Sequence, residues 1–218
     1  MSKGTRSLII IVLAVAVAAA GGYLISRQSA EPQNDPPHQV YAAIPAGGGH
    51  FRGPSSAQVT LVEFGDYQCP SCGAYYPMVE EVLRRYPTQV RLEFHHYPII
   101  SAHPNAMPAA MAAEAAGDQN HYWEMHDLLY QHQKDWSDMA NAQPIFVSYA
   151  TQIGLDPNKF MQSMRAPETQ QRVLQDVMRA NAIEVNQTPT FFIGSDRATL
   201  PMTVDELADW VKSHFSAK

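Results

Sequence analysis

Cysteine is scarce in this 218-residue chain, which contains only Cys69 and Cys72. Two cysteines allow one intramolecular disulfide at most, so a fold that uses them for chemistry must be held together by packing alone. Hydrophobic residues make up 45% of the chain, as in globular proteins with a sizeable core. The sequence therefore predicts one compact domain of ordinary size with an appendage.

An excess of basic residues is also missing. The chain has 15 Lys and Arg against 21 Asp and Glu, and its net charge is -6. A nucleic-acid-binding protein needs a basic surface to meet phosphates. The composition therefore gives no reason to expect nucleic acid as a partner.

Charge is absent from a long apolar run near the N-terminus, from Leu8 to Ile25, and residues 1–27 contain no acid. About 18 apolar residues can span a bilayer once, whereas the small residues Ala18-Ala19-Ala20 are typical of a cleaved signal peptide. Residues 1–27 are therefore predicted to be a signal anchor, the favoured interpretation, or a signal peptide. Because basic residues precede the run, both interpretations place the remainder on the extracytoplasmic side, in the periplasm or cell envelope. In the favoured interpretation, residues 8–25 also anchor the protein in the inner membrane.

Residues 28–50 are rich in proline, glycine and small polar residues, including Gly47-Gly48-Gly49. This composition indicates a tether in which only Val40–Ala43 has the character of an edge strand. The tether is too short to form a domain of its own. The folded domain is predicted over residues 51–218.

The two cysteines lie where a strand-like run, Val59–Phe64, meets a helix-like run. With Cys69 as the N-cap, Pro70 takes the first helical position, where its fixed φ fits and its missing N–H is not needed. A thiol at a helix N-terminus faces unpaired N–H groups and the positive end of the dipole, which should lower its pKa. Cys72 lies one turn further on the same side, within reach of a disulfide. The pattern predicts a redox-active dithiol.

The rest of the chain predicts an α/β fold. Alternation in Val90–Phe94 indicates a second strand, and a strand, helix, strand unit forms a right-handed parallel crossover. From about residue 102 to 183 the sequence shows no convincing strand but several helical segments, which predicts a helical insertion. Strand character returns at Thr190–Ile193, followed by a turn and a short strand near Ala198–Leu200. A capping box at Thr203 then begins a closing helix.

This ordered set of motifs resembles the thioredoxin fold, and the helical insertion makes the chain similar to the Dsb-type (DsbA-like) branch of thiol-disulfide oxidoreductases. The resemblance covers roughly residues 53–215. Its most specific parts are Val59–Phe64 running into Asp66–Cys72, and the later segment Gln187–Phe191. The set is far more specific than a bare Cys-x-x-Cys pair, which zinc sites share.

The resemblance implies a role for each matching residue. Cys69 matches the nucleophile and Cys72 the buried resolving cysteine. Glu63 matches the acidic residue behind the dithiol, where it would take the proton from Cys72, unless its strand leaves it facing solvent. Pro189 matches the proline that follows a cis peptide bond and faces the disulfide, and Thr188 would flank the sulfurs.

The dipeptide between the cysteines departs from the strongest oxidants of the family, which have Pro-His where this chain has Pro70-Ser71. Ser71 can donate a hydrogen bond but carries no positive charge, so it should lower the pKa of Cys69 less than a histidine would. The resemblance implies cysteine-containing protein substrates, a membrane redox partner that resets the dithiol, and no cofactor. Family isomerases dimerise through an added N-terminal domain, and the short tether here is not such a domain. We therefore expect a monomeric oxidase. A disulfide isomerase or reductase is the alternative.

A metal-handling protein is the rival from another class. It would carry copper or zinc with Cys69, Cys72 and one of the nine histidines. However, His95 and His96 would point to opposite faces of a strand, and the histidines of the insertion lack helical i,i+4 spacing. With no third ligand visible, the sequence predicts no metal site.

Overall fold

The structure is a computed structural model that describes residues 48–216. The predicted signal anchor or signal peptide, and the strand expected at Val40–Ala43, lie outside this range. Within the described range, every helix is too short or too polar to span a bilayer.

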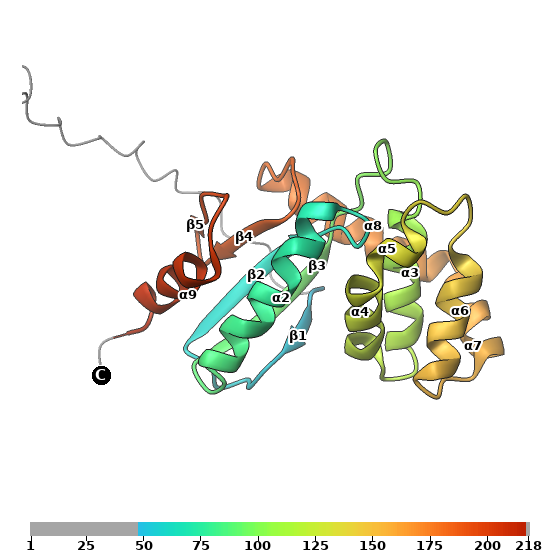
Figure 1. Cartoon of the computed structure of the whole chain (residues 1–218), viewed down its shortest axis with the longest axis horizontal. Coiled ribbons are helices and arrows are strands. Elements are labelled where there is room, and N and C mark those ends of the chain that lie inside the picture. Colours follow the sequence, from blue (N-terminus) through green and yellow to red (C-terminus); the bar gives the residue numbers. More distant parts are fainter. Residues whose placement is uncertain (1–47, 217–218) are drawn as a thin grey trace, which may run out of the picture. The chain divides into compact units, whose positions relative to one another are not determined.

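A mixed five-stranded sheet has the order β1-β3-β2-β4-β5 (Figure 1). Strands β2 and β3 are parallel, and the other neighbouring pairs are antiparallel. Helix α2 connects β2 to β3 as the predicted parallel crossover. The central strand β2 therefore ends where α2 begins. The bounds are β1 (His50–Arg52), β2 (Val59–Gly65), α2 (Pro70–Arg85), β3 (Val90–His96), β4 (Thr190–Ile193) and β5 (Asp196–Arg197).

Two details of the sheet differ from the sequence prediction. The last strand, β5, begins at Asp196 rather than near Ala198, because Gly194 adopts a positive φ of 61° and closes a tight turn with one further residue. Strand β1 was not predicted, since three residues are too few to show a period of alternation.

Six helices lie between β3 and β4, which confirms the predicted helical insertion. Figure 1 shows α3, α4, α6 and α7 packed side by side. They enclose an apolar core in which Trp136, Phe146 and Phe160 are fully buried and which also includes Cys69 and Cys72. The bounds are α3 (Ala106–Gly117), α4 (Tyr122–Gln131), α5 (Gln133–Trp136), α6 (Gln143–Gln152), α7 (Pro157–Met164) and α8 (Pro167–Ala182).

Helices cover both faces of the sheet. On one face, α2 and the closing helix α9 (Val204–Ser213) pack with Leu61 of β2. On the other face, Phe64 packs against Ala180 near the end of α8. Helix α9 begins with the predicted capping box between Thr203 and Glu206. These layers confirm the expected α/β fold, with its sheet split by a helical insertion.

The buried indole of Trp136 offers a test of the insertion core. Its Nε1 donates to the carbonyl of Leu129 at 3.0 Å, and its ring meets Phe146 edge-on. Trp136→Ala should lower the free energy of unfolding by about 3–5 kcal/mol, as for other large buried aromatics. Urea denaturation measures the loss. The half-exposed Leu174 is a control, because Leu174→Ala should change stability by no more than about 0.5 kcal/mol. Equal losses in both variants would contradict this packing.

Candidate active site

The two cysteines lie at the start of α2, as the sequence predicts. Cys69 is the N-cap, with extended backbone angles, and Pro70 is the first helical residue. Both cysteines are free thiols. The Cys69 side chain is 8% exposed and that of Cys72 is fully buried. One sulfur thus lies at the surface edge of the site and the other behind it.

The surroundings of Cys69 favour its thiolate. A hydrogen bond from the Cys72 thiol is the main cause that lowers the pKa of Cys69 to about 5, against the opposing effect of burial. Thr188 and the backbone N–H groups of Ser71 and Cys72 lower the pKa further. Ser71 therefore acts through its backbone at the helix N-terminus, where unpaired N–H groups stabilise negative charge.

The surroundings of Cys72 favour its protonated thiol. Burial raises the pKa of its thiol well above the usual value, and the hydrogen bond and negative charge of Cys69 raise it further. The backbone N–H of Asp66 approaches the Cys72 sulfur at 3.5 Å. One proton is therefore held on Cys72 while Cys69 carries the charge.

Glu63 lies in the centre of the sheet, on β2, paired with Phe94 of β3 and Phe191 of β4. Its side chain is only 3% exposed, so the solvent-facing alternative is wrong. Burial, followed by repulsion from Glu80, raises the pKa of Glu63 to about 8. A carboxyl group with this pKa can gain and lose a proton near neutral pH.

The loop before β4 lies against the nucleophile. The Cys69 sulfur lies 3.4 Å from the carbonyl oxygen of Thr188. The Thr188-Pro189 peptide bond is cis, as the resemblance implies. A second cis bond, before Pro201, was not predicted.

Helices of the insertion hold the dithiol loop, which the sequence did not reveal. Gln133 of α5 donates from its amide to the carbonyls of Tyr67 and Cys69, at 2.7 and 2.8 Å. Gln68 donates to the carbonyl of Ser137 and accepts from the backbone of Asn105. These contacts join residues 30 or more positions apart, so no local pattern could have found them.

Asp66 fixes the same loop from within. Its buried carboxylate accepts from the backbone N–H groups of Gln68 and Ile99 and from His103 Nδ1, the last at 2.6 Å. The bond to Gln68, two residues ahead, is an Asx-turn, and an Asp at this position was the signal that could have identified it.

An opening lies beside the dithiol loop, between the start of α2 and the α4–α5 region. Its volume is about 740 Å³, and its lining mixes polar and apolar surface, with Gln68, Gln133 and Lys134 among its residues. Pro70, next to the nucleophile, also lines it. Space for a bound chain therefore adjoins Cys69.

In the part of the chain that the structure describes, neither sulfur belongs to a group of three or more side chains that could bind a metal ion. One group of three suitable ligand side chains occurs there, and it contains no cysteine.

Curated relatives share one region with this chain. A Na(+)/H(+) antiporter NhaA 1 from Salinispora arenicola is 40% identical over 167 residues, which is 77% of this chain and 25% of the relative. The chain thus spans about a quarter of the length of the curated relatives it matches.

Solved structures share the fold. BdbD from Bacillus subtilis superposes with a TM-score of 0.72 at 20% identity, covering 81% of this chain and 97% of BdbD. A thioredoxin-like oxidoreductase from Silicibacter pomeroyi has a TM-score of 0.64 at 27% identity, covering 76% and 91%.

The family model described as Thioredoxin matches residues 46–213, which include the dithiol, Glu63 and Pro189. The helical insertion that separates the halves of the sheet is also present in the chain. The chain therefore belongs to the thioredoxin family.

Proposed function

We propose that this protein introduces disulfides into cysteine-containing proteins by exchanging its Cys69-Cys72 disulfide with their thiols. The observation that carries the proposal is the contrast between the two sulfurs. Cys69 has a pKa lowered to about 5, whereas the buried Cys72 has a raised pKa. A thiol with a low pKa is a good leaving group, and stabilisation of the reduced dithiol makes its disulfide oxidising.

The exchange takes place in two steps that balance. A substrate thiolate attacks the Cys69 sulfur, the Cys69-Cys72 bond breaks, and Cys72 leaves as a thiolate that takes up a proton. A second substrate thiolate then attacks the substrate sulfur of the mixed disulfide, and Cys69 leaves as its stabilised thiolate. The substrate loses two electrons and the dithiol gains them. A redox partner, which we place in the membrane, must then remove these electrons.

Glu63 supplies the proton in this scheme. Because its pKa is raised to about 8, it is protonated at pH 7 and can donate to the departing Cys72 thiolate. In the reverse direction its carboxylate accepts the proton from Cys72. Pro189 and Thr188 would hold the substrate chain, since the Thr188 backbone lies next to the Cys69 sulfur.

An isomerase or reductase remains the second candidate, because the same residues support exchange in either direction. We favour the oxidase because of the low pKa of Cys69. We also propose an extracytoplasmic location, with the protein held at the membrane by residues 8–25. An oxidising compartment would allow the dithiol to persist as a disulfide.

The reduction potential of the dithiol tests the direction of exchange. In glutathione buffers we expect a value above about −200 mV, closer to that of strong oxidants than to the roughly −270 mV of thioredoxin. Cys69→Ser should abolish exchange and leave the fold intact. A potential near that of thioredoxin would exclude the oxidase, and exchange by Cys69→Ser would exclude Cys69 as the nucleophile.

The reactivity of Cys69 should follow its thiolate. In the reduced protein, the rate of alkylation should rise with pH around a midpoint near 5. Cys72→Ala removes the main hydrogen bond and should move the midpoint toward that of an ordinary thiol. Cys72→Ser retains a hydroxyl donor and should move it less. An unchanged midpoint in Cys72→Ala would mean that the hydrogen bond is not the cause.

The same thiolate makes stability depend on pH. Between about pH 5 and pH 9, Cys69 is deprotonated in the folded protein and protonated in the unfolded chain. The unfolded state then binds more protons, so the reduced protein should gain stability relative to the oxidised protein as pH rises through this window, and lose it below 5. Denaturation of both forms at several pH values measures the difference.

Glu63→Gln should slow reduction of the Cys69-Cys72 disulfide roughly tenfold or more, because general acid catalysis is lost. In the wild type, the rate of disulfide reduction, divided by the fraction of substrate present as thiolate, should fall as pH rises through about 8. The variant should lack this fall. Glu81→Gln, at a surface residue paired with Arg84 and Arg85, is the matched control and should retain it.

A further inference from the structure

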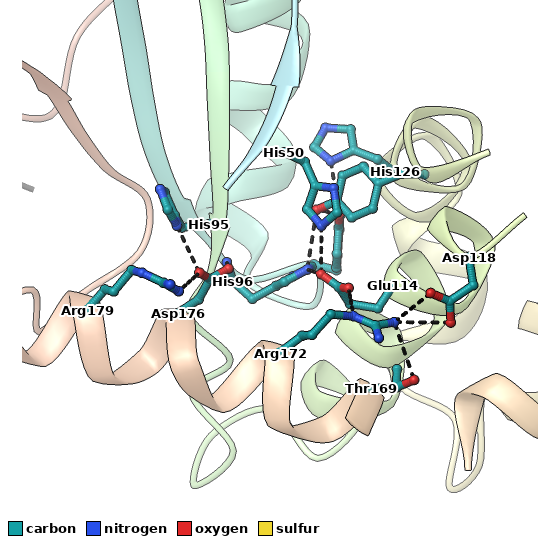
Figure 2. A network of polar contacts seen from close by, with 12 residues as sticks. His50, His95, His96, Glu114, Asp118, His126, Thr169, Arg172, Asp176 and Arg179 are labelled. Carbon is teal, nitrogen blue, oxygen red and sulfur yellow. Dashed lines mark hydrogen bonds and ion pairs between the residues drawn. The ribbon is translucent and has the colours of Figure 1, made fainter. Parts of the chain in front are cut away.

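A second cluster of reactive side chains lies outside the dithiol site, where β1, β3 and α3 meet (Figure 2). His50 Nε2 lies 2.7 Å from Glu114 Oε1, and His96 Nε2 lies 3.0 Å from the same oxygen. The ligand atoms of the three residues all lie within 4.8 Å of one another. Two imidazoles and one carboxylate therefore converge on a single small volume.

The carboxylate of Glu114 is held in place from its other side. Arg172 of α8 donates from Nε to Oε2, so Oε1 is the oxygen that faces the imidazoles (Figure 2). Arg172 also pairs with Asp118, which fixes the guanidinium in turn. Burial opposes ionisation of Glu114, but the hydrogen bonds from His50 and His96 outweigh it and lower its pKa. The group is thus an oriented anion facing two imidazole nitrogens.

The imidazoles are oriented as well. The His50 ring stacks on Tyr122 with 3.4 Å between the ring centroids. His96, at the end of β3, is buried, and its Nε2 lies 3.3 Å from the Tyr122 hydroxyl. The ring positions are therefore set by packing and not only by Glu114.

Without a metal, Glu114 Oε1 must accept N–H groups from both imidazoles, and each ring must carry its proton on Nε2. With a metal, both Nε2 lone pairs and Oε1 would bind one cation. Tetrahedral ligands at about 2.1 Å from zinc lie roughly 3.4 Å apart. The two nitrogens would need to move away from Oε1 by roughly 0.4–0.7 Å, while all three ligand atoms already lie within 4.8 Å of one another. Rotation of side chains can supply shifts of this size.

We propose that His50, His96 and Glu114 form a binding site for a divalent transition metal such as Zn²⁺. Imidazole nitrogen with one carboxylate suits zinc and its neighbours, whereas Ca²⁺ and Mg²⁺ prefer all-oxygen sets. His50 is 27% exposed and provides the route of entry, since the other two side chains are almost fully buried. Three protein ligands leave a fourth position for water. A metal there would tie the edge strand β1 to β3 and to the insertion.

Zinc titration of the full-length oxidised protein tests the site. The disulfide form is used because it removes the dithiol as a competing ligand. We expect one Zn²⁺ per chain by calorimetry and a rise in melting temperature with added Zn²⁺. Co²⁺ should give visible bands without thiolate charge transfer.

Variants separate this site from other histidines. His50→Ala should weaken Zn²⁺ binding at least tenfold and abolish the rise in melting temperature, and Glu114→Gln should do the same. His132→Ala is the matched control, because His132 is an exposed histidine that also pairs with a carboxylate, that of Asp135. It should bind Zn²⁺ as the wild type does. His50 lies at the surface edge of the cluster, so its variant keeps the test valid even if Glu114→Gln fails to fold.

Three results would overturn the proposal: no stoichiometric Zn²⁺ binding to the oxidised wild type, undiminished binding by His50→Ala, or an equal loss in His132→Ala. If the melting temperature of the wild type does not respond to zinc, and His50→Ala lowers the melting temperature in the absence of zinc, the cluster is a metal-free ion pair instead. Because the oxidised form is used, a failure here leaves the proposed thiol exchange untouched.

Discussion

The hydrogen bond from the buried Cys72 thiol to the Cys69 sulfur is the interaction on which the active site depends. It gives the two sulfurs opposite proton affinities although they lie one helical turn apart. The helix N-terminus alone would favour both thiolates, and burial alone would disfavour both. The combination assigns the negative charge to the sulfur nearer the surface. Glu63, buried in the adjacent strand, has a pKa raised to about 8, as the proposed proton exchange with Cys72 requires.

The helical insertion contributes to this site by support and not by chemistry. Gln133 of the insertion binds the backbone of the dithiol loop, and Gln68 of that loop binds the backbone of the insertion. Amide hydrogen bonds in both directions therefore fix the loop to the insertion. Gly73 permits this contact, because a Cβ there would lie 2.5 Å from the Gln133 side chain. An exchange enzyme needs its nucleophile held against two different sulfurs in turn, and a rigid loop serves that purpose.

Local chemistry could be predicted from the sequence, whereas contacts between distant segments could not. The N-cap position of Cys69, Pro70 at the first helical residue and the capping box at Thr203 all depend on neighbours within a few residues, and the structure has each of them. Gln133 and the cluster around Glu114 depend on which helix packs against which strand. Spacing within one helix or strand, the basis for expecting no metal site, cannot detect ligands from β1, β3 and α3.

The shortness of the two edge strands limits the ways in which the sheet can be extended. Strand β1 has three residues and β5 has two, and each contains a charged residue. Arg52 of β1 is committed to Glu80 and Asp127. A long, flat edge would template the addition of any extended client segment and lead to aggregation, whereas short charged edges resist it. The sheet therefore offers little edge to which a further extended segment could add.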